Sequence, residues 1–225
     1  MRPRGNRGRV PPAFVGCALA LALAACAAAP VRYYTLASTA PPQAVRQVAD
    51  VSGRKMPIHF DLASVGVPER LARPQMVVRS AADRGSTRVD VLEQQRWSSP
   101  FDSELRDALA SAIASRLGAV DVTRGGQLPG HPVYRIAVRL RQFDAILDQR
   151  VNADFGWTIT RSDDERNAIC RSFDSEPVSS GMDGLVQGVQ RAVANTADRI
   201  AAKIARLQDN RSAPCDSREA PGSAS

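Results

Sequence analysis

Aromatic residues and histidines are scarce in this sequence. Phe, Trp and Tyr make up 5% of the 225 residues, and only 2 histidines are present. Because proteins that bind single-stranded nucleic acid stack its bases on aromatic side chains, this composition argues against that class. The histidines, His59 and His131, are far apart, and no CxxC or HxxxH pattern occurs. We therefore expect no metal site.

Motifs of catalysis are missing as well. The sequence has no phosphate-binding loop, no nucleophile elbow and no pair of carboxylates in a recognisable catalytic setting. Nothing near either histidine indicates a catalytic triad. We expect that the protein is not an enzyme and that it binds no cofactor.

More than half of the excess positive charge lies at the N-terminus. The formal net charge is +7, from 30 basic and 23 acidic residues. Residues 1–25 contain four arginines and no acidic residue, so removing them leaves 26 basic against 23 acidic residues, a net charge of +3. A general binder of nucleic acid is therefore not indicated.

The N-terminus has the pattern of a bacterial lipoprotein signal. An arginine-rich segment, 1–10, precedes an apolar run, 13–25, which is too short to span a bilayer, since that takes about 20 residues. The run leads into Leu23-Ala24-Ala25-Cys26, which matches a lipobox. We predict that residues 1–25 are a signal peptide removed before Cys26. The Cys26 sulfur then receives diacylglycerol, and the new amino group receives an acyl chain such as palmitate.

The residue after the predicted anchor indicates in which of the two bacterial membranes the protein is anchored. Position 27 is Ala rather than Asp, so the usual inner-membrane retention signal is missing. This favours the periplasmic face of the outer membrane, with more than one acyl chain giving stable attachment. We expect a linker at 26–32, a domain at 33–207 and a disordered tail at 208–225. The alternatives are a cleavage site with a chance cysteine, or lipidation of Cys17.

Two further cysteines remain for the folded part of the chain, Cys170 and Cys215. In an oxidising compartment an even pair is a candidate disulfide. The alternative is two unrelated free thiols, one in a sheet and one in a tail.

The hydrophobic pattern predicts a single α+β domain, with a mainly antiparallel sheet and two long helices packed on one face. One helix is expected to start with Ser99 as its cap, Pro100 at its first position and Asp102 at its third, and to stop at Gly118. The second, capped by Ser180, is expected over 183–207 with an apolar stripe. The expected strands are 31–37, 57–67, 75–79, 87–93, 133–143, 151–160 and about 166–175.

One expected strand carries arginines on the side opposite its apolar residues: Arg135, Arg139 and Arg141. The guanidinium group suits phosphate geometrically, so these residues are candidates for contact with phospholipid headgroups. The alternative is an ordinary solvated face, since the chain uses 28 arginines but only Lys55 and Lys203 as lysines.

Four segments follow the lipobox: Tyr33-Tyr34-Thr35-Leu36, Val65-Gly66-Val67-Pro68-Glu69-Arg70-Leu71-Ala72, Val89-Asp90-Val91-Leu92 and Arg96-Trp97-Ser98-Ser99-Pro100-Phe101. In that order they resemble the PqiC family, the ABC-type transport auxiliary lipoproteins. The resemblance extends over nearly the whole mature chain, including the strand ending in Trp157-Thr158-Ile159 and the last helix. The Cys170 and Cys215 pair departs from the family pattern.

This resemblance implies a non-enzymatic component of an intermembrane phospholipid transport system. Such lipoproteins work with an MCE-domain tunnel protein and can assemble into homo-oligomeric rings at its outer-membrane end. Trp97 would then lie either in the core or in a subunit interface, and Pro68 and Arg70 in a loop that faces a neighbour. The alternative function is a structural lipoprotein that braces another envelope complex or tethers the membrane to the cell wall.

Overall fold

The computed structural model describes residues 29–37, 57–80, 87–123, 125, 130–164, 167–209 and 215. The predicted signal peptide and Cys26 lie outside these residues. Contacts group the residues from Arg32 onward into one compact unit, separate from the residues up to Val31. The elements are β1 (Arg32–Tyr34), β2 (His59–Gly66), the 3-10 helix η2 (Glu69–Leu71), β3 (Gln75–Val78), β4 (Asp90–Trp97), α2 (Phe101–Leu117), β5 (Val120–Asp121), β6 (Val133–Ile146), β7 (Arg150–Arg161), β8 (Asn167–Pro177) and α3 (Gly181–Gln208).

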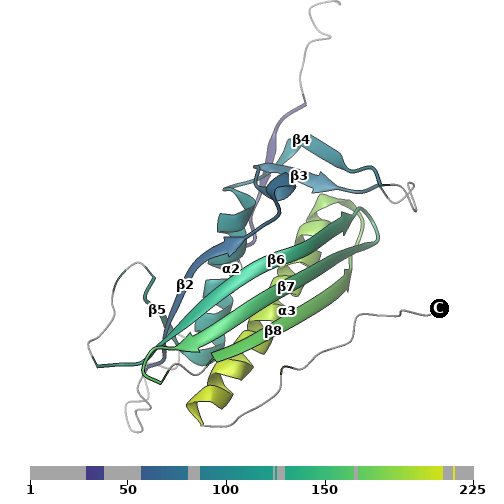
Figure 1. Cartoon of the computed structure of the whole chain (residues 1–225). Coiled ribbons are helices and arrows are strands. Elements are labelled where there is room, and N and C mark those ends of the chain that lie inside the picture. Colours follow the sequence, from purple (N-terminus) through teal and green to yellow (C-terminus); the bar gives the residue numbers. More distant parts are fainter. Residues whose placement is uncertain are drawn as a thin grey trace, which may run out of the picture. The chain divides into compact units, whose positions relative to one another are not determined.

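The larger sheet has five strands in the order β5-β2-β6-β7-β8, and α2 and α3 pack on one face of it (Figure 1). The last three strands form the expected antiparallel meander. β2 pairs in parallel with both β5 and β6, because the chain passes through β3, β4 and α2 before it returns to the sheet. The α+β class is confirmed, and the larger sheet is mixed, with two antiparallel and two parallel strand pairings.

The smaller sheet has three strands in the order β1-β4-β3. β1 runs parallel to β4, with Tyr34 opposite Trp97. Just after β3, the Arg79 amide donates to the Ala145 carbonyl at 2.8 Å, and the Leu147 amide donates to the Arg79 carbonyl at 3.0 Å. These backbone bonds connect the smaller sheet to the end of β6.

The core lies between the helices and the larger sheet. On β7 the residues at every second position from Val151 to Ile159 are buried against the helices. The apolar stripe expected on α3 is also buried, which confirms the amphipathic assignment. It consists of Leu185, Val189, Val193, Ala197, Ile200 and Ile204.

The helix starts differ from the sequence expectation. α2 starts at Phe101, and Pro100, with extended backbone angles, occupies the cap position. Ser99 therefore lies one residue before the cap position, and its side chain bonds elsewhere. Ser180 is the cap residue of α3, but its side chain makes no capping hydrogen bond. Gly118 ends α2 as expected, at a φ of 58° that glycine adopts without strain.

Two short elements, β5 and η2, have no clear signal in the sequence. β4 starts later than expected and continues to Trp97. None of the helices in the described residues combines the length and apolarity needed to cross a membrane.

Candidate functional site

A buried carboxylate joins the first strand of the domain to the start of α2. The side chain of Glu104, in the first turn of α2, accepts hydrogen bonds from the Leu36 amide at 2.8 Å and the Thr35 hydroxyl at 2.9 Å. Its other oxygen accepts from the Ser98 hydroxyl at 2.5 Å and from the Ser99 hydroxyl and amide at 2.9 and 3.1 Å. We call these five residues the Glu104 junction. It explains why the Ser99 hydroxyl does not cap the helix.

The Glu104 junction holds its carboxylate in the charged form. Burial by itself raises the pKa of Glu104, but the hydrogen bonds from Ser98, Leu36, Ser99 and Thr35 outweigh it and lower the pKa below the ordinary value of 4.5. The charge also lies in the first turn of α2, where the helix dipole favours an anion. The junction is therefore most stable when Glu104 is ionised.

Trp97 lies beside this junction and in the core. Only 6% of its surface is exposed, and its ring stacks on Phe101 at 5.0 Å between centroids. Phe101 in turn packs on Phe143 at 5.3 Å. The Trp97 amide donates to the Pro74 carbonyl and the Ser98 amide to the Tyr34 carbonyl, both at 2.8 Å, so the backbone that carries the ring is held to two other segments. Trp97 has little surface left to offer to another subunit.

Pro68 and Arg70 lie in the connection between β2 and β3. The Pro68 carbonyl accepts the Leu71 amide at 2.8 Å and thereby starts η2. Arg70 is exposed and donates a long hydrogen bond, 3.4 Å, to the Phe143 carbonyl. This short loop is available at the surface, and its role in an interface stays a prediction.

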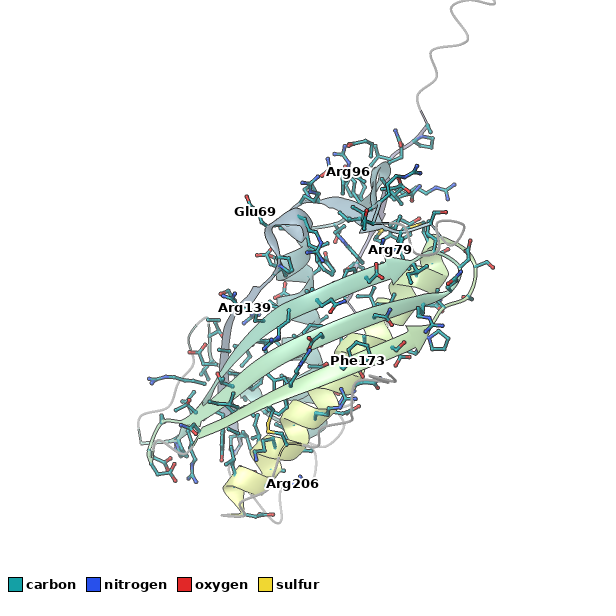
Figure 2. All side chains as sticks on the ribbon, turned by 45° about the vertical axis from the view of Figure 1, so that its right-hand side comes forward. Glu69, Arg79, Arg96, Arg139, Phe173 and Arg206 are labelled. Atoms are coloured by element: carbon teal, nitrogen blue, oxygen red, sulfur yellow. A yellow bond between two sulfur atoms is a disulfide. The ribbon has the colours of Figure 1, made fainter. Side chains whose placement is uncertain are left out.

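The three arginines predicted on one strand lie on β6, on the face of the larger sheet that the helices do not cover. Figure 2 shows Arg139 on this face. Arg135, Arg139 and Arg141 are all exposed. Arg141 approaches the carboxylate of Asp154 at 3.9 Å. No ion pair involves Arg135 or Arg139 within the part of the chain that the structure describes. Their contact with lipid stays a prediction.

Asp154 is a functional candidate that sequence reasoning missed. It lies on β7, on the same face as these arginines, yet only 2% of it is exposed. The Arg171 guanidinium, on β8, covers it with two hydrogen bonds of 2.7 and 2.6 Å. These bonds and the Asp154 charge raise the pKa of Arg171. Since the alternating pattern places Asp154 among outward residues, the sequence carries no signal of its burial.

The structure joins Cys170 and Cys215 in a disulfide. Cys170 lies on β8, an edge strand of the larger sheet, and Cys215 follows the end of α3. Residues 210–214 and 216–225 lie outside the described residues. Over the part that the structure describes, no three side chains of His, Cys, Asp or Glu come close enough to hold a metal ion.

Two solved structures share this fold. One, a crystal structure of an uncharacterized protein, is 18% identical over 78% of this chain and 99% of its own, with a TM-score of 0.58. The other, a DUF330 protein from Xanthomonas campestris, is 15% identical over 72% of this chain and 92% of its own, with a TM-score of 0.54. None of the curated proteins compared with the chain matches it.

The model of one protein family matches residues 34–201. The match begins in β1 and ends within α3, so it contains the whole Glu104 junction and both sheets except the first residues of β1. It also covers the four segments on which the sequence resemblance rests, apart from Tyr33. The chain therefore belongs to the family of ABC-type transport auxiliary lipoprotein components.

Proposed function

We propose that this protein is a non-catalytic lipoprotein of an MCE and ABC-type phospholipid transport system, anchored by Cys26 to the periplasmic face of the outer membrane. There it receives the outer-membrane end of an MCE-domain tunnel protein, as a homo-oligomeric ring. The observation that carries this proposal is the family match over residues 34–201. The lipobox at Cys26 and the Ala at position 27 support the choice of membrane.

The Glu104 junction supports a rigid attachment close to the membrane. Arg32, the start of β1, is six positions after Cys26, so an extended linker reaches about 20 Å. Directly after β1, Thr35 and Leu36 bond to the Glu104 carboxylate on α2. The chain directly after β1 is thus fixed to α2, and in this proposal the short linker keeps the domain near the bilayer surface.

The energy for transport would come from other components. The sequence has no phosphate-binding loop, so this chain does not supply nucleotide hydrolysis by that motif. In this proposal the chain contributes position and a docking surface, and a separate ATPase drives lipid movement.

Substitution of the two N-terminal cysteines tests the anchor. We expect Cys26→Ser to abolish acylation and to move the protein from the outer-membrane fraction of a density gradient to the released periplasmic fraction. Cys17→Ser is the matched control, because it changes a cysteine of the apolar run without touching the lipobox, and it should fractionate as the wild type. Mass spectrometry of the mature N-terminus identifies the acylated residue.

Two results would contradict the proposal. Wild-type protein in the inner-membrane fraction would rule out the outer-membrane position. Cys26→Ser protein that remains acylated and membrane-bound would rule out Cys26 as the anchor.

A further inference from the structure

The face of the larger sheet that the helices leave uncovered carries an open groove. Its volume is about 720 Å³, within the usual range for sites that bind small molecules. It runs across β2, β6, β7 and β8. The residues that line it include Ser64, Gly66, Ala137, Arg139, Thr158 and Ile169.

Small residues make the floor of this groove. Four residues pair in one row across the sheet, in the order Gly66, Arg139, Gly156 and Arg171. Arg139 therefore has a glycine on each side, where any other residue would place a side chain. A Cβ at Gly66 would lie 3.5 Å from the Arg139 Nε atom, and a Cβ at Gly156 would lie 3.2 Å from the Arg141 Cδ atom. The glycines therefore let these two arginine side chains lie close to the sheet, where they line the groove.

The next row of the sheet has small or apolar side chains. It contains Ala137 and Thr158, and it ends at Ile169 on β8. Ile169 is 76% exposed, more than any other large hydrophobic residue of the described part of the chain. An isoleucine this exposed beside a hollow is a surface that an apolar ligand would cover.

The charge of the groove is positive. Arg139 and Arg141 line it. Elsewhere on this face, Arg135 lies opposite Asp61 in the strand register, and Asp154 is bonded by Arg171 and approached by Arg141. The Asp154 carboxylate is thus already satisfied. Arg139, in the middle of the groove, forms no ion pair within the described residues, so its guanidinium is free to bind an anion.

We propose that this groove binds one phospholipid molecule, with the phosphate on Arg139 and an acyl chain along Ala137, Thr158 and Ile169. An anionic group beside an apolar chain fits a guanidinium beside an apolar floor. The choice of a phospholipid rests on the proposed function, which places the domain at a membrane surface. The position of the site rests on the groove alone.

Photo-crosslinking in the intact envelope tests this site. Ile169 is replaced by benzoylphenylalanine in the full-length chain, and cells are grown with radioactive phosphate and irradiated. The purified protein is expected to carry a labelled phospholipid, whereas free phosphate offers no carbon chain for crosslinking to this position. The same replacement at Val120, which is 44% exposed on β5, is the control and should give little label.

Two second-site variants check that the adduct depends on the groove. Arg139→Glu should reduce the label at position 169 about tenfold, because it removes one charge-assisted contact and repels the phosphate. Gly66→Leu should reduce it as well, because the leucine side chain would compete with the Arg139 side chain for the space above position 66, while its Cβ itself fits at 3.5 Å. Arg73→Glu, at an exposed arginine of the β2 to β3 connection, is the matched charge control and should leave the label unchanged.

Three results would overturn the proposal. Equal labelling at Ile169 and Val120 would indicate general contact with the membrane. An adduct to another protein would identify a protein-docking surface. An absence of adducts in folded protein would exclude the lipid. Each readout is independent of any MCE-domain partner. The lipid site can therefore be excluded while the proposed function holds, and the proposed function can be excluded while the lipid site holds.

Discussion

Glu104→Ala is expected to lower the free energy of unfolding by about 3 kcal/mol at neutral pH. The alanine leaves the Leu36 and Ser99 amides and three hydroxyl groups without their acceptor. Because the carboxylate is buried, water does not readily replace it. Urea denaturation, followed by tryptophan fluorescence, measures the loss. Glu69→Ala, at an exposed glutamate on η2, is the control and should change stability by less than about 0.5 kcal/mol.

The effect of Glu104 should also depend on pH. Its folded-state pKa is below the ordinary value of 4.5, so its ionisation stabilises the fold fully above that value. As the pH falls through the folded-state pKa, this contribution is lost. The stability difference between wild type and Glu104→Gln should therefore be constant near neutral pH and shrink below about pH 4.5. A difference that grows on acidification would contradict the ionised junction.

Trp97→Ala is expected to lower the free energy of unfolding by about 4 kcal/mol, because it removes a buried ring and leaves a cavity beside Phe101. Trp97→Phe, which keeps an aromatic ring against Phe101, should cost clearly less. Thermal unfolding by circular dichroism measures both variants, and light scattering records their oligomeric state.

The combination of these two readouts separates the two roles considered for Trp97. If Trp97 is a core residue, its substitution lowers the melting temperature in whichever oligomeric state the protein adopts. If the melting temperature stayed unchanged while the oligomer dissociated, Trp97 would instead belong to a subunit interface.

Local patterns were sufficient to predict most elements. The alternation of Tyr134, Ile136 and Val138 with exposed residues identifies β6, and similar alternation identifies β7. Short connections then require antiparallel neighbours. The parallel pairing of β2 with β6 depends on contacts between residues more than 70 positions apart, as for His59 and Val133, which no local period encodes.

The candidate site was predicted less completely. The sequence identified the arginines of β6 and the segment Arg96-Trp97-Ser98-Ser99-Pro100-Phe101, but it did not identify Glu104 as the acceptor that this segment surrounds. Two of its donors, Thr35 and Leu36, are 69 and 68 residues away along the chain. The glycines beside Arg139 were likewise separate in the sequence, and only the strand register places them in one row.

The proposed function requires that this lipoprotein dock an MCE-domain protein at the outer membrane. The most direct measurement is purification of the tagged, lipidated chain from chemically crosslinked envelopes, with its partners identified by mass spectrometry. We expect recovery of an MCE-domain protein with the wild type and a strong reduction with Cys26→Ser, since the proposed anchor is then missing. Enrichment of peptidoglycan or of an unrelated envelope complex, without any MCE-domain protein, would contradict it.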